Sequence, residues 1–362
     1  MRTLNSRDIL SLVADGRIAP PSFDDILMAP SYSDIESRSD PSIETRLSSD
    51  FTLEKPIISS PMDTVTEHHM ASEIGSHGAM GIIHRFMSVG EQIENISRVL
   101  ESNSPVAFAM GVGPAERDRL STIFGHFGSD LDWVSIDVAN GHSKYMGDTL
   151  SWVKDRVGDS VNIMAGNVAT GEGYLYLSEL GADSVRVGIG GGSICKTRIM
   201  TGFGIPTFSS IIDAYRYRVN HHGRASIIAD GGIRYPSDLV KSIAAGADAV
   251  MAGRIFAGTT ESPGEVICID GSNYKAYRGM ASREVQEERR GGMKPGTCPE
   301  GVSTRIELTG SANAILEEFC GGFRSGMTYQ GSRNISQFKE GARFIMMSQS
   351  SLNESHAFGT KF

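Results

Sequence analysis

The sequence is poor in cysteine, in long apolar runs and in positive charge. Its four cysteines, Cys195, Cys268, Cys298 and Cys320, form no CxxC pair and share no metal-ligand spacing with a histidine. This excludes a disulfide framework and a structural zinc site, and free thiols lead us to expect a reducing, cytoplasmic location. No stretch approaches the ~20 apolar residues of a membrane span, so we expect neither insertion in a membrane nor export.

Positive charge is scarce as well. The chain has 34 lysines and arginines against 43 aspartates and glutamates, a net charge of −9. Nothing supplies the positive field that many phosphates require, which argues against a general binder of nucleic acid or of membrane surfaces. A local site for one nucleotide stays open. The 362 residues suffice for one large α/β barrel or two modest domains, and composition does not choose between them.

Eight short apolar runs follow a polar N-terminal arm. They occupy residues 56–63, 79–85, 105–112, 132–141, 161–168, 183–190, 225–232 and 248–255, and each holds four or more apolar residues. Such runs are typical of strands buried on both faces, and amphipathic helical patterns such as VGEQIENISRVLES separate them. The alternation predicts an α/β protein, a (β/α)8 TIM barrel. A doubly wound open sheet would need a GxGxxG after the first strand, and none is present.

The regular pattern ends after residue 256. Residues 281–310 are charged, glycine-rich and without apolar periodicity, so we expect a long mobile flap over the barrel mouth. The following segment, SANAILEEFCGGFRSGMTYQG, predicts a helix that closes the barrel, and residues 346–362 a polar C-terminal tail. We therefore expect residues 1–362 to form a single barrel domain.

A glycine-rich loop after the sixth predicted strand presents one cysteine. It reads GIGGGSICKTR, and Cys195 has Lys196 and Arg198 close by in sequence. Cationic neighbours and free backbone N–H groups stabilise a thiolate, which favours a nucleophile. A small buried side chain is the more common role of a lone cysteine, so the loop alone leaves both interpretations open.

Polar residues end the predicted strands, on the face where TIM barrels carry active sites. The glycines of ADGG (229–232) and MAGR (251–254) occupy the usual phosphate position of this fold, where Arg254 adds positive charge. Asp230 suits the hydroxyls of a ribose, because a carboxylate accepts two hydrogen bonds.

Other polar residues are ambiguous one by one. Asp137 and Asn140 end the fourth strand and Asn167 ends the fifth, where each is equally suited to cap a helix. Glu300 stands in the flap, where a carboxylate can close over the site as a proton donor or acceptor. An exposed loop glutamate is more often merely solvated.

Several motifs, in order along the chain, resemble the IMP dehydrogenase/GMP reductase family. They are GIGGGSICKTR, IDVANGHS, IMAGNVATGE, IIADGGI, AGRIFAGTTESPGE and YRGMAS, and the likeness runs from FDDILMAP to NESH. The resemblance implies that Cys195 attacks C2 of a purine ring and that a nicotinamide cofactor exchanges hydride with this carbon. It also implies that Thr197 and Glu300 assist proton transfer.

The resemblance assigns further residues to ligands. It places the cofactor at Asp137, Asn140 and Asn167. The residues expected at the nucleotide are Ser60, Met62, Ser193, Asp230, Gly232, Gly253, Arg254, Met280 and Ser282, although the two methionines are of a type more common in cores. Carbonyls of Gly190, Gly192 and Cys195 resemble a potassium site that the ESHAF tail of a neighbouring subunit completes, which would imply a homotetramer activated by K+.

Three features favour the reductase member. IMP dehydrogenases mostly carry a paired regulatory (CBS) insertion after the second strand and helix, whereas ENISRVLESNSP runs directly into the third strand here. They activate water with an Arg-Tyr pair on the flap, and none occurs between Ala281 and Leu308. The spacing from YRGM to CPEG is short, as in reductase flaps. We therefore predict a GMP reductase that converts GMP and NADPH to IMP, ammonia and NADP+.

Two alternatives remain. SPMDTVTE, IIHRFMS, YRGM and the terminal ESH are dehydrogenase-like, which favours an IMP dehydrogenase without CBS domains that uses NAD. A catalytically inert paralogue that binds purine nucleotides is the other, although it would need neither Cys195 nor its partners. Gly191 replaces a common proline, and Lys196 replaces a small residue and adds a charge close to the nucleophile. The flap reads PGTCPEG where reductases carry a YRASEG-like stretch, which leaves the purine and the choice of NADPH or NADH open.

Overall fold

Eight parallel strands close into a barrel in the computed structural model, which describes residues 3–290 and 298–355. The strands are β4 (Ile57–Ser59), β5 (Met80–Ile83), β6 (Ala107–Met110), β7 (Trp133–Asp137), β8 (Asn162–Val168), β9 (Ser184–Val187), β10 (Ser226–Asp230) and β11 (Ala249–Ala252). They pair in chain order, and β11 returns to β4, where Val250 lies opposite Ile57. Each strand falls within one of the eight apolar runs, so the predicted TIM barrel is confirmed.

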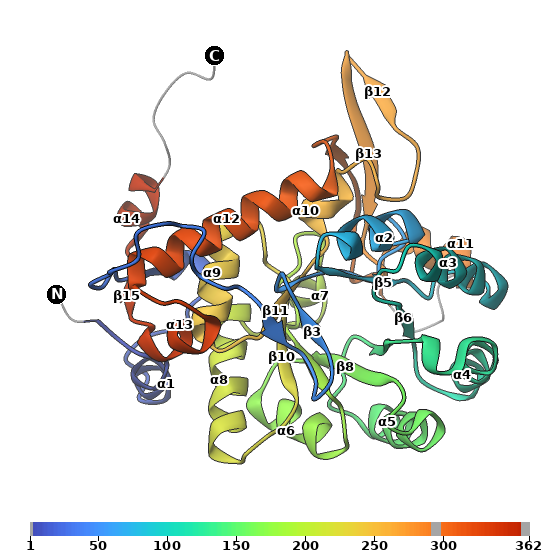
Figure 1. Cartoon of the computed structure of the whole chain (residues 1–362), viewed down its shortest axis with the longest axis horizontal. Helices are drawn as coiled ribbons and strands as arrows, with labels where there is room; N and C mark the ends of the chain where they lie inside the picture. The colour runs from blue at the N-terminus through green and yellow to red at the C-terminus, as the bar shows by residue number, and fades with distance from the viewer. Residues whose placement is uncertain (1–2, 291–297, 356–362) are drawn as a thin grey trace.

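Helices surround the barrel (Figure 1). The ring contains α2 (His68–Ser76), α3 (Val89–Glu101), α4 (Pro114–Phe127), α5 (Lys144–Val157), α6 (Gly171–Glu179), α8 (Thr207–Asn220), α9 (Pro236–Ala245) and α12 (Ala312–Gln330). Polar side chains cap the first turns of α3, α5, α6 and α12. In α3 the Ser88 hydroxyl accepts a hydrogen bond from the Glu91 backbone N–H, and the Glu91 carboxylate accepts one from the Ser88 N–H. Helix α12 packs against α9 and α2 and so closes the ring, as predicted.

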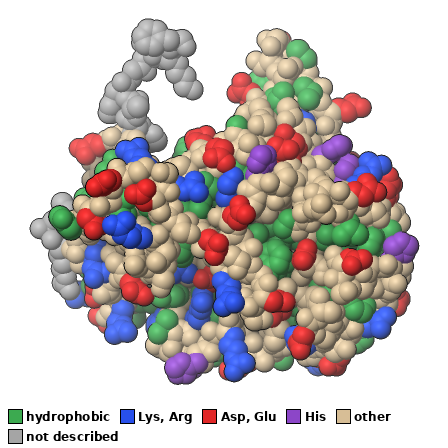
Figure 2. Space-filling model, in the orientation of Figure 1, with side chains coloured by type: hydrophobic (Ala, Val, Ile, Leu, Met, Phe, Trp, Pro, Cys, Tyr) green, Lys and Arg blue, Asp and Glu red, His purple; other side chains and the backbone are tan. Residues whose placement is uncertain are grey.

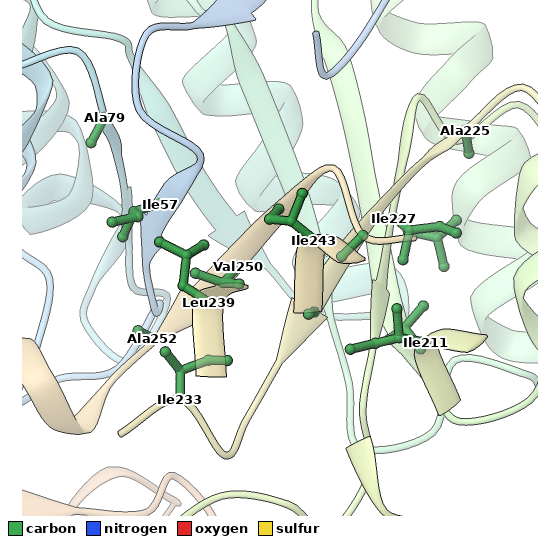
Figure 3. Packing of buried hydrophobic residues seen from close by; sticks show 14 of the residues in the cluster. Ile57, Ala79, Ile211, Ala225, Ile227, Ile233, Leu239, Ile243, Val250 and Ala252 are labelled. Atoms are coloured by element: carbon green, nitrogen blue, oxygen red, sulfur yellow. The ribbon is translucent and has the colours of Figure 1, made fainter. Parts of the chain in front are cut away.

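The strands are buried on both faces. Inward side chains such as Ile58 and Met251 fill the barrel. Outward side chains such as Ile57 and Val250 pack against the helices, and Figure 3 shows both beside Leu239 of α9. Burial of each aliphatic side chain contributes about 1.5–3 kcal/mol, so this double packing supplies much of the stability of the barrel.

A hairpin closes the N-terminal end of the barrel. It consists of β2 (Thr45–Arg46) and β3 (Thr52–Leu53). The carbonyl of Leu47 in its turn accepts hydrogen bonds from the hydroxyls of Ser184 and Ser226, at 3.2 and 2.9 Å. These two serines begin β9 and β10, so the hairpin is tied directly to the barrel wall.

A group of buried charges lies at the same end, at the start of β11. The Asp248 carboxylate accepts hydrogen bonds from Arg218 at 2.5 Å and from Lys339 at 2.6 Å. It also accepts one from the backbone N–H of Ile227 at 2.7 Å. Burial alone would raise the pKa of Asp248, but the two cations and this N–H hold it below its usual value. Both oxygens of the Asp248 carboxylate therefore have hydrogen-bond partners within the protein.

The two ends of the chain pack together. Strand β1 (Ile26–Met28) pairs antiparallel with β15 (Phe344–Met346). The predicted polar arm contains a helix, α1 (Ser6–Ala14), whose Ile9 side chain is buried. The predicted tail contains another, α14 (Gln349–Glu354), and residues 356–362 lie outside the described residues. The smaller remaining elements are η1 (Phe23–Asp25), η2 (Gly128–Asp130), α7 (Thr197–Thr201), α10 (Arg254–Ala257) and α13 (Ile335–Gly341).

The segment after β11 is more ordered than predicted. It forms a three-stranded antiparallel sheet of β12 (Ile267–Ile269), β13 (Ser272–Arg278) and β14 (Ser303–Glu307), and β12 and β13 project from the barrel in Figure 1. Helix α11 (Arg283–Arg290) begins the flap, while residues 291–297 lie outside the described residues. This sheet was not predicted, because β14 is polar and largely exposed, so its backbone pairing with β13 leaves little apolar pattern.

The surface carries both signs of charge. Figure 2 shows acidic and basic side chains interspersed over one face, in keeping with the net charge of −9. Among residues 3–290 and 298–355, no helix is long and apolar enough to cross a membrane.

Candidate active site

A cavity of about 460 Å³ opens at the carboxyl ends of the barrel strands. Ser60, Met62, Asp137, Asn167, Gly190, Gly192, Cys195, Thr197, Asp230 and Met280 line it, together with Arg85 and Arg186. A smaller cavity of about 110 Å³ adjoins it and shares Ser60, Met62 and Asp230. Residues from seven separate parts of the sequence thus meet where a TIM barrel carries its chemistry.

The loop after β9 presents Cys195 at this cavity. Gly188 begins the loop at φ +149°, and a Cβ there would lie 1.9 Å from the carbonyl oxygen of Asp230, so only glycine fits. Gly191 is also constrained, because a Cβ would lie 2.3 Å from the Thr207 hydroxyl. Closer to the cysteine, the backbone N–H of Cys195 donates to the carbonyl of Gly192 at 3.1 Å. The glycines therefore let the loop lie against β10 and hold the half-buried thiol at the cavity.

A continuous hydrogen-bonded chain starts at the thiol. The Cys195 Sγ lies 3.1 Å from Thr197 Oγ1, and this hydroxyl donates to Glu300 Oε2 at 2.8 Å. A thiol proton can pass to the threonine oxygen while the threonine proton passes to the carboxylate. The structure thus brings together the three residues predicted as catalytic, although Glu300 lies far from the other two in sequence.

Backbone pairing delivers Glu300 to this position. Its N–H donates to the carbonyl of Ala281 at 3.0 Å, and its carbonyl accepts from the N–H of Lys196 at 2.7 Å. Next to it, the N–H of Val302 donates to the carbonyl of Ile194 at 3.1 Å. Backbone hydrogen bonds therefore hold the flap against the cysteine loop. Lys196 contributes through its backbone, and its side chain is exposed.

The smaller cavity contains the groups predicted for a phosphate. Ser193, Gly232, Gly253 and Arg254 all line it. The hydroxyl of Tyr277 on β13 lies 3.4 Å from Ser193 Oγ and adds a further polar group. Burial raises the pKa of Tyr277, so it is a neutral hydrogen-bond donor.

Sequence analysis did not identify Tyr277 as a site residue. Its strand was not predicted, and its place in the motif YRGMAS was the available signal. A Cβ at Gly253 would lie 3.3 Å from its hydroxyl, which shows how closely Tyr277 approaches the loop after β11.

Two carboxylates face each other across the main cavity, joined by an arginine that the sequence analysis also missed. Arg186 Nη1 donates to Asp137 Oδ1 at 2.6 Å, and Nη2 donates to Asp230 Oδ2 at 2.8 Å. Burial would lower the pKa of Arg186, but the two carboxylates outweigh it and raise this pKa. Asn167 donates to Asp230 Oδ2 at 2.8 Å and to the carbonyl of Gly188, so its amide nitrogen is engaged with the protein.

Arg85 adds a second cation beside this group. Its Nε lies 3.7 Å from Asp137 Oδ2, and its Nη2 is 3.4 Å from the Asp137 carbonyl. Among the described residues, the buried Nε has no hydrogen-bond partner. A buried N–H without a partner beside a cavity fits an acceptor group on a ligand, such as the carboxamide oxygen of a nicotinamide.

Two predicted contacts lie away from the cavity. Asn140 is exposed, and its side chain accepts a hydrogen bond from the His142 N–H at 3.2 Å, a local turn. Ser282 is fully buried, and its hydroxyl accepts from the Val285 N–H at 3.4 Å at the start of α11. The expected ligand contacts of Asn140 and Ser282 are therefore not seen, and each side chain instead accepts a backbone N–H close to it in sequence.

The structure does not confirm a site for K+. Gly190, Gly192 and Cys195 lie together in the loop, with the Gly192 carbonyl accepting from Cys195. Of the tail motif, Glu354 ends α14 and Ser355 follows it, while the rest is outside the described residues. Helix α14 lies beside η1 and away from α7 in Figure 1. Among the described residues, no group of three or more His, Cys, Asp or Glu side chains could hold a metal ion.

Comparison with known proteins agrees with this geometry. Residues 21–358 match the model of the IMP dehydrogenase / GMP reductase domain. The chain is 35% identical to the inosine-5'-monophosphate dehydrogenases of Borreliella burgdorferi and of Cryptosporidium parvum. Each match covers 92% of this chain, and the two matches cover 96% and 94% of the respective relatives. That of Aquifex aeolicus is 41% identical over 69% of this chain and 51% of its own length.

These relatives bear on the predicted identity in two ways. All three carry the dehydrogenase name, so the expected likeness to GMP reductase in particular is not confirmed. The match to the domain model spans most of the sequence and includes the cavity, the cysteine loop and the described part of the flap. The chain therefore belongs to the IMP dehydrogenase/GMP reductase family of oxidoreductases that act on purine nucleotides.

Proposed function

We propose that this protein reductively deaminates GMP with NADPH, giving IMP, ammonia and NADP+. The observation that carries the proposal is the pairing of an intact Cys195–Thr197–Glu300 chain with a flap that lacks an Arg-Tyr pair between residues 281 and 308. The first provides a nucleophile and a proton path. The second removes the water-activating pair expected of a dehydrogenase, so a covalent purine intermediate would be resolved by hydride instead of hydrolysis.

Cys195, Thr197 and Glu300 would have distinct roles in this reaction. Cys195 Sγ would form a bond to C2 of the purine, and the C2–N bond to the amino group would break as the nitrogen takes up a proton. As the thiol attacks, its proton would pass along the 3.1 Å contact to Thr197 and on to the Glu300 carboxylate at 2.8 Å. The Glu300 carboxyl, acting through the Thr197 hydroxyl, would then give this proton to the departing nitrogen. The cofactor, when bound, supplies hydride to C2, and Cys195 leaves as a thiolate.

The rest of the cavity would hold the ligands. The ribose would lie at Asp230, and the phosphate in the smaller cavity beside Ser193, Arg254 and Tyr277. The nicotinamide would lie toward Asp137 and Arg85, where the unpartnered Arg85 Nε fits its carboxamide.

A second candidate is an IMP dehydrogenase that forms XMP with NAD. The names and the 35% identity of relatives that cover 92% of the chain favour it. The structure joins α3 to β6 through residues 102–106 alone, so no CBS pair would occupy that position in either case.

The absorbance of the reduced cofactor separates these candidates. Purified protein should oxidise NADPH when GMP is added and release ammonia in equal amount. Reduction of NAD by IMP, without oxidation of NADPH by GMP, would establish the dehydrogenase instead. If neither pair reacts while GMP binds in calorimetry, the protein is a nucleotide-binding paralogue without this activity.

A further inference from the structure

Arg186 is the least expected residue of the cavity. It lies in β9, within the apolar run SVRV, and its side chain is only 6% exposed. A buried charge in a barrel strand is costly unless it is paired and fully hydrogen-bonded. The structure shows such pairing, with a carboxylate on either side.

The geometry of these contacts requires an arginine. Nη1 reaches Asp137 on β7 at 2.6 Å, while Nε and Nη2 reach Asp230 on β10 at 3.2 and 2.8 Å. A planar guanidinium can serve two carboxylates at once, whereas an ammonium on a flexible stem cannot span both in this way.

A glycine on the intervening strand makes room for the arginine. Gly166 of β8 lies between β7 and β9, and a Cβ there would be 2.6 Å from the Cβ of Arg186. The small residue therefore allows the arginine side chain to pass over β8 and reach β7.

The arrangement also fixes what Asp230 can offer to a ligand. Its Oδ2 accepts three N–H groups, two from Arg186 and one from Asn167. In the described part of the chain, no hydrogen bond uses Oδ1. Asp230 was predicted to accept two ribose hydroxyls, and the structure leaves one oxygen, with two lone pairs, for that purpose.

We propose that Arg186 is a positioning residue that couples the nucleotide half of the cavity to the cofactor half. By holding both carboxylates, it presents Asp230 Oδ1 to the ribose and orients Asp137 toward the cofactor, so that one residue sets the affinity for both ligands. The proposal rests on the proposed function only in assigning the two ligands to these carboxylates, and it holds for either direction of hydride transfer.

Other cations lie near the two carboxylates. Arg85 lies beside Asp137, and Arg234 and Arg254 line the smaller cavity that Asp230 shares. Among the described residues, Arg186 is nevertheless the side chain that donates hydrogen bonds to both carboxylates.

The test uses Arg186→Lys and Arg186→Met, with Arg218→Lys as a matched control at the opposite end of the barrel. Arg218 also pairs with a buried carboxylate but is remote from the cavity. Arg186→Lys should raise KM about tenfold for both nucleotide and cofactor, as expected for a lost charged hydrogen bond on each side. Arg186→Met, which removes every hydrogen bond to the two carboxylates, should raise both KM values further than Arg186→Lys does. Arg218→Lys should lower Tm and leave both KM values unchanged.

The outcomes separate coupling from a purely structural role. The proposal fails if Arg186→Lys lowers Tm as Arg218→Lys does while both KM values stay within about twofold of the wild type. It also fails if only one KM moves, because the arginine would then serve a single ligand. Calorimetry with GMP and with IMP should show the tenfold loss of nucleotide affinity whichever reaction the wild type catalyses, so failure of the proposed function is recognised independently.

Discussion

Each end of the barrel carries a group of three paired charged side chains, and the signs of the charges are reversed between the two ends. At the N-terminal end, one carboxylate, Asp248, lies between two cations, Arg218 and Lys339. At the C-terminal end, one cation, Arg186, lies between two carboxylates, Asp137 and Asp230. Both groups are largely buried and link strands to distant parts of the chain.

The difference lies in what each group leaves available. At the N-terminal end the carboxylate receives two cations and a backbone N–H, and the hairpin covers the barrel. At the C-terminal end Asp230 keeps one oxygen available and Arg85 keeps a buried Nε unpartnered among the described residues. Asp248, Arg218 and Lys339 also line a cavity of about 860 Å³, but both carboxylate oxygens of Asp248 are already hydrogen-bonded, whereas Asp230 keeps an oxygen for a ligand. A substitution at one end should therefore leave the role of the other end unchanged.

The largest effect is expected at the nucleophile. Cys195→Ser should lower turnover by about 10³-fold or more, because serine is a far weaker nucleophile in the same position. Nucleotide affinity and Tm should stay near their wild-type values, as nothing else in the cavity changes. Cofactor oxidation and calorimetry with GMP measure the two quantities. Cys268→Ser, on the exposed strand β12, is the matched control and should retain full activity. Turnover near the wild-type rate in Cys195→Ser would rule out a covalent mechanism.

The reverse pattern is expected at the N-terminal end. Asp248→Asn leaves two buried cations without their carboxylate, and removal of one partner from a buried ion pair costs about 3–5 kcal/mol. Urea unfolding should show this loss, while kcat at a temperature where the variant is folded should match the wild type. A change in kcat without a change in stability would contradict the separation of the two ends.

Asp248 should also make the free energy of unfolding depend on pH. The folded pKa of Asp248 lies below the ordinary 3.8, so its contribution is complete above that value and is lost as pH falls through the lower folded value. The free energy of unfolding of the wild type should therefore decrease in this acid range. In Asp248→Asn the decrease should be smaller, and equal slopes for the two proteins would show that Asp248 does not contribute to it.

A smaller effect is expected where the flap meets the cysteine loop. Glu300→Gln keeps the hydrogen bond to Thr197 but removes the exchangeable proton, so deamination should slow about 10²-fold. Deamination would then limit turnover, and the isotope effect with NADPH deuterated at the transferred position should fall toward one. Glu284→Gln, an exposed flap carboxylate that accepts from Ser303, is the control and should leave both values unchanged. A larger isotope effect in Glu300→Gln would place the residue in the hydride step instead.

The barrel could be predicted from sequence because each strand is buried on both faces, and burial of this kind demands a continuous apolar run. The sheet of β12, β13 and β14 could not, since its stability comes from backbone pairing between polar, exposed residues such as those of β14. The helix α1 was missed for a related reason: only Ile9 of it is fully buried, so its apolar stripe is thin.

The candidate site could also be predicted only in part from the sequence. Cys195 and Thr197 share one loop and could be found from local chemistry, while Glu300 joins them through backbone pairing that no sequence spacing reveals. Arg186 did leave a signal, because a charged residue inside a buried apolar strand needs a partner. That partner could not be identified, since Asp137 and Asp230 lie on different strands that only the closed barrel brings together.

The smallest effect is expected at Asn140, where sequence and structure differ. The sequence analysis grouped it with Asp137 at the cofactor, but its exposed side chain accepts the His142 N–H in a local turn. Asn140→Ala should therefore change the cofactor KM by no more than about twofold, the usual size of a surface effect. Asp137→Asn, which weakens the pair with Arg186, should change it by about tenfold. If Asn140→Ala matched that tenfold change, the loop after β7 would have to turn inward when the cofactor binds, and the ligand-binding end of the barrel would extend beyond the cavity seen here.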